Sequence, residues 1–251
     1  MSTVYDTIEA LLDRMRSDVE GLTAQGDARR FFHGTYLRTT EAVVAEIDAG
    51  GFLDAAWLRA WDLVFADLYV AALDADLHGQ PVPQPWRIAF DAARDQPGLA
   101  PLRHVLFGIN AHINYDLPQA LVAVMTPADF DNPEVVRRRA ADHRHLDDVL
   151  SSRVAAEDAE LTAMSRVTLL DRILRPFNRL GTKRFLAEAR EKVWRNAVVL
   201  DRARRAGPAR YAEVLGGLEQ RSAARLADLT APGPVLLRLA LRGFGVLLPG
   251  A

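Results

Sequence analysis

Apolar residues recur every three or four positions along most of the chain, which is the spacing of one face of an α-helix. This spacing predicts helices that begin near residues 8, 27, 54 and 86, separated by turns rich in Gly, Pro and Asp. No stretch alternates apolar and polar residues over the length of a strand. We therefore expect an all-α protein, built as an orthogonal, irregular helical bundle.

The stretch LRHVLFGINAHINYDLPQAL is the one around which the rest of the chain is organised. Between His104 and Thr126 the only formal charge is that of Asp116. Because a helix this apolar is normally buried, we expect it to form the centre of the bundle, over about residues 99–117. Pro118 is expected to kink or restart the helix, because proline has no backbone N–H to donate.

The predicted central helix nevertheless carries five polar side chains within seven residues: Asn110, His112, Asn114, Tyr115 and Asp116. Buried polar groups are costly unless they are paired, so this cluster is our candidate catalytic site. On a helix, His112 and Asp116 share one face and the two asparagines share another. The first face can bind a divalent metal or act as an acid/base pair, and the second is suited to orienting neighbours. A helix-to-helix polar network is the structural alternative.

Two further residues supply chemistry suited to a metal site. His33 is flanked by aromatic residues, and Asp67 lies in a helix that is otherwise nearly all apolar. A buried carboxylate needs a cation, a metal or a hydrogen-bond donor. Together with His112 and Asp116, these residues make a set of two histidines and two carboxylates that suits zinc, manganese or iron. Each residue alone is more often a satisfied core group.

The second half of the chain predicts long helices. They are expected from Asn132 to as far as Ala163, from Arg166 to Arg205 with a break near Pro176 or Gly181, from Pro208 to Leu229, and as a short apolar helix after Pro232. We expect a single domain over residues 1–251. All six histidines lie between His33 and His145, so residues 1–150 are expected to carry the site and residues 151–251 to act as scaffold.

Two smaller features leave alternatives open. Gly108 leaves space beside the central helix, for a neighbouring helix or for a ligand, and helix packing is the commoner reason. Asp142, His143 and His145 lie in a polar segment that favours a solvated helix face. One of these three residues is suited to facing inward, toward the central helix.

Composition and charge exclude several classes of function. The 251 residues include 31 Lys+Arg and 33 Asp+Glu, a formal charge of −2, which gives no reason to expect a nucleic-acid partner. The chain has no cysteine, so disulfides, thiolate metal sites and cysteine nucleophiles are excluded. The dinucleotide and P-loop glycine patterns, GxSxG and HExxH are also absent.

Membrane association is the next class to consider. The N-terminus lacks the pattern of a signal peptide, and no apolar run reaches the ~20 residues of a spanning helix. We therefore expect a soluble, cytoplasmic protein. The run at 235–248 is apolar but contains Arg238 and Arg242, so it is suited to peripheral membrane contact or to lining a lipid-like pocket. Core or dimer packing is the commoner use of such a run.

The run GINAHINYDLPQAL, with HGTYLRTT and PWRIAF before it and DFDNPEVVRRRAADH after it, resembles a family of bacterial proteins of unknown function. The resemblance covers most of the chain, and NAHINYDLP is its most specific part. It implies an all-helical fold in a family common in actinobacteria. It places in the family's signature segments His33, Trp86, Asn110, His112, Asn114, Tyr115 and Asp116. It implies no particular reaction.

The sequence leads to two hypotheses from different classes. The first is an enzyme with a buried His/Asp/Asn pocket, in which a divalent metal activates water to hydrolyse a small or lipid-like substrate. The second is a non-catalytic helical protein, in which the same polar groups orient a small apolar ligand. The oligomeric state is left open by the sequence.

Overall fold

The computed structural model describes residues 5–146, 149, 169–231, 238 and 243–251, with the backbone alone described for residues 169–186. The described residues form helices and no strand, which confirms the all-α prediction. In chain order the helices are α1 (Ile8–Ala24), α2 (Arg29–Asp48), α3 (Ala55–Leu77), α4 (Gln84–Asp95), α5 (Pro101–Ala111), the π turn η1 (His112–Asp116), α6 (Leu117–Val124), α7 (Pro127–Asp131), a helix at 133–146, α9 (Leu169–Ala206) and α10 (Pro208–Thr230).

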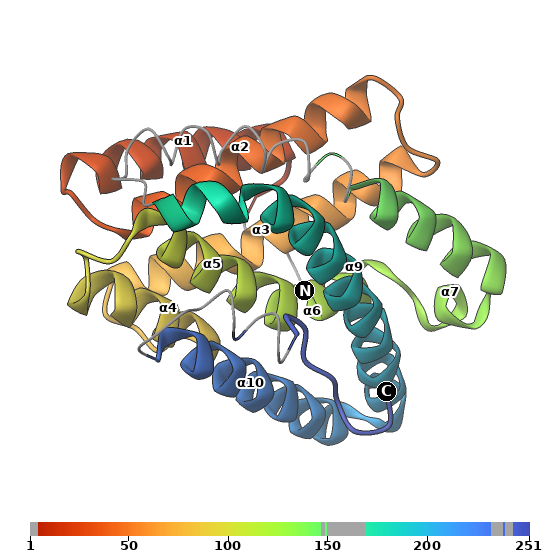
Figure 1. The fold of residues 1–251 in the computed structure, drawn as a ribbon. Coiled ribbons are helices and arrows are strands. Elements are labelled where there is room, and N and C mark those ends of the chain that lie inside the picture. Colours follow the sequence, from red (N-terminus) through yellow and green to blue (C-terminus); the bar gives the residue numbers. More distant parts are fainter. Residues whose placement is uncertain (1–4, 147–148, 150–168, 232–237, 239–242) are drawn as a thin grey trace.

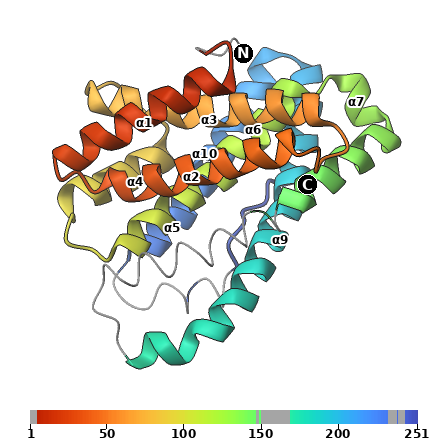
Figure 2. The same ribbon diagram turned by 90° about the horizontal axis from the view of Figure 1, so that it is seen from above.

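The stretch from α5 through η1 to α6 lies at the centre of the bundle, as the apolar pattern predicts. In Figure 1, α1 and α2 lie along one side and α10 along the opposite side, with α5 and α6 between them. In Figure 2, which looks from above, α1 and α2 lie nearest the viewer and α10 is seen behind them. The central stretch contacts helices on every side: α2, α3, α4, α9 and α10. Most of its side chains between His104 and Val122 are therefore buried.

Side-chain caps explain where several helices begin. The Asp54 carboxylate accepts a hydrogen bond from Trp57 N at 3.3 Å, which caps α3. Asn132 Oδ1 accepts from Glu134 N at 3.0 Å and opens the helix at 133–146. Such caps satisfy backbone donors that have no partner within the helix. Both starts agree with the sequence prediction.

The restart predicted at Pro118 takes the form of a π turn. The backbone N–H of Leu117 donates to the carbonyl of His112, five residues earlier, and α6 then begins with Pro118 in its first turn. A π turn holds one more residue than an α turn, and such turns are frequent at functional sites. Here the wider turn coincides with the polar cluster itself, because η1 spans His112–Asp116.

Two predictions for the second half of the chain need correction or a limit. The break predicted near Pro176 or Gly181 is wrong, because α9 runs through both positions as one helix. A proline removes one backbone hydrogen bond but does not have to end a long helix, and the last turns of α9 are held by packing against α6 and α10. The predicted extension of the preceding helix to Ala163 falls on residues that the structure does not describe.

The described residues bear out the C-terminal helix predicted after Pro232 only at Arg238, which is helical. Residues 243–248 are not helical, and Phe244, Val246 and Leu248 are buried in the core. These three side chains are therefore not available for the peripheral membrane contact suggested for 235–248. The rest of that run lies outside the described residues, Arg238 excepted. Among the helices that are described, none is long and apolar enough to cross a membrane.

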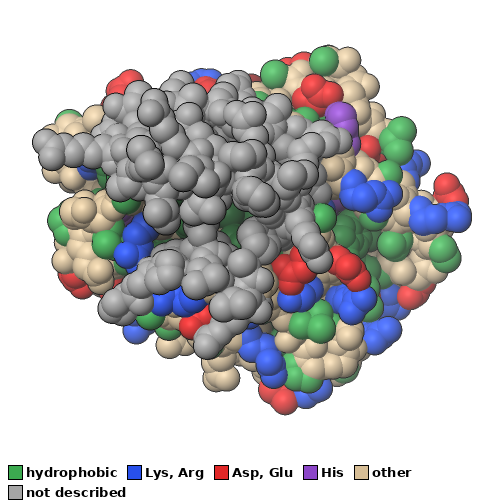
Figure 3. Space-filling model, viewed as in Figure 1, with side chains coloured by type: hydrophobic (Ala, Val, Ile, Leu, Met, Phe, Trp, Pro, Cys, Tyr) green, Lys and Arg blue, Asp and Glu red, His purple; other side chains and the backbone are tan. Residues whose placement is uncertain are grey.

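Charged side chains of both signs are interspersed over the described part of the face shown in Figure 3. Many charged side chains of the described residues form ion pairs one helical turn apart, for example Lys192 with Glu188 and Arg195 with Glu191. Such pairs neutralise each other locally, so this face offers no strong field to a polyanion. The arrangement agrees with the nearly balanced composition.

Gly108 shows how closely α2 approaches the central helix. A Cβ atom placed on Gly108 would lie 2.2 Å from Cγ of Phe32. The space predicted beside this glycine is therefore occupied by the aromatic ring of a neighbouring helix, and not by a ligand. Glycine is required here by packing.

Gly108→Ala is expected to lower the free energy of unfolding by about 1–3 kcal/mol, because the new methyl group overlaps the buried Phe32 ring. Urea denaturation measures this change. Gly21→Ala in α1 is the matched control, since nothing lies within 4 Å of its added Cβ. That variant should be stabilised by about 0.5–1 kcal/mol. Equal effects of the two substitutions would show that Phe32 does not restrict this position.

Candidate functional site

His112 and Asp116 form a hydrogen-bonded pair in the interior. His112 Nδ1 lies 2.8 Å from Asp116 Oδ2, and both side chains are nearly inaccessible to water. Trp86 of α4 donates its indole N–H to the same carboxylate oxygen, also at 2.8 Å. The predicted one-turn spacing thus brings the two residues together, and Trp86 holds the carboxylate from the opposite helix.

The protonation of this pair follows from its burial. Burial lowers the pKa of His112, and burial also raises the pKa of Asp116 against the opposing hydrogen bonds from His112 and Trp86. A neutral His112 with its proton on Nδ1 donates to Asp116, as the hydrogen-bond network requires. His112 Nε2 is then a bare acceptor, and it is buried without a hydrogen-bond partner. The arrangement is that of a base oriented by a carboxylate.

Aromatic rings enclose the His112 imidazole. Phe65 of α3 stacks on it, with ring centroids 3.6 Å apart and ring planes 4° from parallel. Tyr36 of α2 meets it edge to face at 4.5 Å. A second layer of rings, with centroids at 5.8–6.1 Å, consists of Phe32, Tyr69 and Trp86. This shell of low polarity is the physical cause of the lowered pKa of His112.

Asn110 and Asn114 hold the C-terminal segment. Both donate their amide N–H to the carbonyl of Phe244, at 3.3 and 3.1 Å. Asn114 Oδ1 also accepts from Val246 N at 3.0 Å. The two side chains therefore pair with an extended backbone as a neighbouring strand would. These two candidate catalytic residues thus use their side-chain amides to bind the protein backbone. This agrees with the expectation that their face of the central helix orients neighbouring segments.

Helix α9 holds the other edge of the same segment. Asn196 donates to Val246 O at 3.0 Å and accepts from Leu248 N at 2.8 Å. Glu188 accepts from Phe244 N at 3.1 Å. The extended segment thus lies between η1 and α9 with its backbone groups satisfied from both sides, although its partners are side chains and not a strand.

Tyr115 lies beside this network in the π turn. Its side chain is buried, and burial, together with the charges of Glu219 and Asp116, raises the pKa of its phenol. Its backbone carbonyl accepts from Gln119 Nε2 at 2.8 Å. The phenol is therefore neutral near pH 7 and keeps its hydroxyl proton.

His33 and Asp67 do not join His112 and Asp116 in a metal site. The His33 ring bonds to Met15 O at 2.8 Å and to the Tyr69 hydroxyl at 3.0 Å, so both of its nitrogens are in use. Asp67 is buried on α3. Among the described residues, no group of three or more His, Asp or Glu side chains is placed to hold a metal ion. The four predicted ligands are thus not assembled, because the backbone of α1 and Tyr69 satisfy His33 instead.

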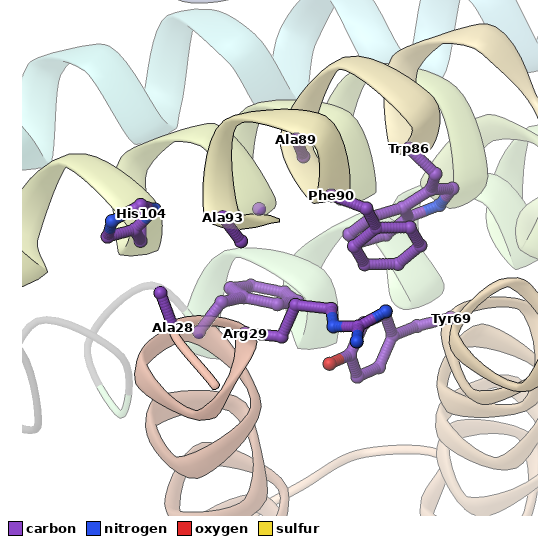
Figure 4. A pocket seen from close by; sticks show the side chains of 10 residues that line it. Ala28, Arg29, Tyr69, Trp86, Ala89, Phe90, Ala93 and His104 are labelled. Atoms are coloured by element: carbon purple, nitrogen blue, oxygen red, sulfur yellow. The ribbon is translucent and has the colours of Figure 1, made fainter. Parts of the chain in front are cut away.

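A small pocket lies next to the aromatic shell. Figure 4 shows it between α4, which carries Trp86 and Phe90, and the start of α2, with His104 at its far end. Its inner wall contains Phe32, Tyr69 and Trp86, the same rings that surround His112. The cavity of about 10 Å³ has room for about one water molecule. Three rings of the shell around His112 thus also line this pocket.

The sequence model of one protein family, described as "Family of unknown function (DUF5995)", matches residues 8–232. The chain belongs to this family. The matched span includes every residue of the candidate site except the C-terminal segment that Asn110 and Asn114 bind. No curated protein and no solved structure matches the chain. The family match confirms one part of the resemblance noted in the sequence, namely that the chain belongs to a domain family of unknown function.

The sequence analysis did not identify three residues of the site by the chemistry of their side chains. Trp86 appeared only in a segment of the family resemblance, and Tyr36 only as a neighbour of His33. Asp62 was missed, although it lies one turn before Phe65 in the same apolar helix whose pattern singled out Asp67. Its side chain is 3% exposed, Oδ2 has no hydrogen-bond partner, and burial raises its pKa to about 7.

The cluster of Asp142, His143 and His145 faces the protein core more than its polar sequence suggests. Asp142 accepts from Leu53 N at 2.7 Å and from Asp54 N at 2.8 Å, near the start of α3. His143 is fully buried and accepts from Trp194 Nε1 at 2.9 Å. Two residues of this cluster therefore face the core, where one was expected.

Asn114→Ala is expected to lower the free energy of unfolding by about 2 kcal/mol, because it leaves buried backbone groups of Phe244 and Val246 with fewer partners. Amide hydrogen exchange should become faster at residues 244–248. Asn132→Ala is the control, since it removes a helix cap far from this segment at a cost of about 1 kcal/mol. Unchanged exchange at 244–248 in Asn114→Ala would contradict the holding role.

Asp62→Asn is expected to raise stability in a pH-dependent way. The folded pKa of about 7 lies above the ordinary aspartate pKa of 3.8, so the unfolded chain loses this proton first as the pH rises. The free energy of unfolding of the wild-type protein therefore decreases between about pH 4 and pH 7. The variant should be more stable above pH 7, by at most ~4 kcal/mol, and the difference should shrink toward pH 4. Urea denaturation across this range measures it, and a constant difference would contradict the buried, unpaired carboxyl.

Proposed function

We propose that this protein is an enzyme that acts on a small organic molecule by acid–base chemistry, with His112 as the group that accepts and returns the proton. One observation carries the proposal. The imidazole is held by Asp116 through Nδ1, whereas Nε2 is buried without a partner. A bare, oriented imidazole nitrogen is what a general base requires.

The neighbours of His112 support this role energetically. Proton transfer to Nε2 creates an imidazolium ion whose Nδ1 lies 2.8 Å from Asp116 Oδ2 and donates its proton to it. The charge that develops is therefore stabilised at the moment it appears, while Trp86 keeps the carboxylate in place. The aromatic shell excludes water and keeps the resting imidazole neutral.

Hydrolysis is the simplest reaction of this kind. His112 Nε2 removes a proton from water as the water oxygen attacks the substrate, and the same nitrogen then returns the proton to the leaving group. The proposal differs from the metal-dependent hydrolysis suggested by the sequence, because both His33 nitrogens bond within the protein. It takes the NAHINYDLP run, which contains His112 and Asp116, as the signature of the family's active site.

A non-catalytic binding protein is the second candidate, and the aromatic shell favours it. Five aromatic rings surround one polar nitrogen: those of Phe32, Tyr36, Phe65, Tyr69 and Trp86. Apolar walls with a few placed polar atoms are typical of small-molecule sites. In this function His112 Nε2 accepts a hydrogen bond from a ligand and transfers no proton.

His112→Ala and Asp116→Asn are expected to lower kcat/KM by at least about 100-fold on any substrate that the wild-type protein turns over. The measurement is a turnover assay on a panel of small esters, amides and phosphate esters. In Asp116→Asn the fold is kept, but the imidazole loses the charge that holds its tautomer. The loss should therefore appear mainly in kcat.

His145→Ala is the matched control. That histidine also pairs with a carboxylate, Glu46 at 2.9 Å, but it lies at the surface. Its variant should keep wild-type turnover. Equal turnover in His112→Ala and the wild type would overturn the proposal, and the absence of any turnover in the panel, combined with saturable binding of a small molecule, would favour the binding protein.

A further inference from the structure

The C-terminal segment is held in the way that a protein holds an extended peptide. The N–H and the carbonyl of Phe244, Gly245 and Val246, and the N–H of Leu248, each bond to a side chain of α5, η1 or α9. In Figure 1 this segment is the dark blue trace that ends beside α9. In peptide sites, such main-chain hydrogen bonds supply affinity, and pockets for alternate side chains supply specificity.

Two asparagine amides bind the backbone of the segment in a regular register. Asn114 donates to the carbonyl of Phe244 and accepts from the N–H of Val246, two residues further on. Asn196 makes the same pair of bonds with the carbonyl of Val246 and the N–H of Leu248. Each carboxamide thus takes the place of a peptide group in a neighbouring strand. The two amides together fix which residues of the segment face the core.

The groove between η1 and α9 also selects side chains. Its alternate apolar side chains are at most 8% exposed: Phe244, Val246 and Leu248. Gly245 lies directly on α9, because a Cβ atom placed on it would be 2.9 Å from Cα of Ala189. A helix backbone cannot swing aside as a flexible side chain can, so glycine is required here. Leu247 is partly exposed. The groove therefore fits the pattern apolar–Gly–apolar–any residue–apolar.

The groove and its occupant lie in different parts of the chain. The side chains that bind the segment all lie within residues 8–232, the span that matches the family model, whereas the segment lies beyond that span. Every copy of this chain carries one such groove and one segment that fits it. The contacts that a segment makes in its own groove are therefore available to it in the groove of another copy.

We propose that this groove is a peptide-binding site that accepts residues 244–248 of a second copy of this chain in place of its own segment. Exchange of an identical element between copies costs little, because the contacts given up in one groove are regained in the other. The inference goes beyond the proposed function and does not depend on it. It uses the face of the central helix that carries Asn110 and Asn114, and not the face of His112 and Asp116.

A peptide of residues 243–251 tests the groove. It is labelled at its first residue and titrated into full-length Gly245→Val, whose own segment is kept off α9 by the added side chain. Fluorescence anisotropy should show saturable binding, at least about tenfold tighter than to the wild type, where the tethered segment competes. Circular dichroism checks that the variant keeps its helices. Val246→Pro, which removes the N–H that Asn114 accepts, replaces it if the helices are lost.

Substitutions in the peptide and in the groove show what is recognised. Gly245→Ala in the peptide should weaken binding at least about tenfold, because its methyl group meets the backbone of α9. Leu247→Ala in the peptide is the matched control and should change the affinity less than about threefold. Asn196→Ala, added to the Gly245→Val protein, should weaken binding about tenfold. Equal binding of the three peptides, or no saturable binding by a folded variant, would overturn the proposal.

Mixing two full-length variants tests exchange between copies. Gly245→Val keeps an empty groove, and Asn114→Ala combined with Asn196→Ala keeps a free segment. Above the Kd of the peptide, analytical ultracentrifugation should show a heavier species in the mixture than in either variant alone. The same double variant mixed with the wild type, whose groove is filled, is the control and should not form this species. Peptide binding without a heavier species in the mixture would reject the second copy as the occupant.

Discussion

Burial of polar groups on the central helix is the constraint on which the rest of the structure depends. The stretch from α5 to α6 is enclosed on every side, so each polar side chain on it needs a partner from another element. Asp116 finds Trp86 of α4, and Asn114 finds the backbone of the C-terminal segment. The positions of α4 and of the chain end relative to the centre follow from these contacts.

The two polar faces of the central helix differ in which side-chain atoms they leave without hydrogen-bond partners. The Asn114 amide uses both its donor and its acceptor on the extended segment. On the other face His112 uses Nδ1 alone, and Nε2 is left bare within aromatic rings. On the first face Asn110 Oδ1 is also without a partner, but the amides of both asparagines bind the C-terminal segment, so we assign the chemistry to the second face.

Asp62 adds a carboxyl that nothing in the described fold neutralises. Most buried acids here receive donors, as Asp142 does from the backbone at Leu53 and Asp54. Asp62 Oδ2 receives none, and burial alone raises its pKa. A protein that keeps such a group loses stability as the pH rises.

The sequence by itself determined the all-α class, the burial of the central helix and the pairing of His112 with Asp116, because helical periodicity and i, i+4 spacing are local properties. It also predicted the helix starts near Asp54 and Asn132 for the same reason. Only the tertiary structure decided which groups from distant elements meet. It brought Trp86 to Asp116, Tyr36 and Phe65 to His112, and Phe32 to Gly108. It also turned His33 toward Met15 and Tyr69, away from a metal site. Such contacts depend on how helices pack across long stretches of chain, and the spacing of residues within one helix carries no information about them.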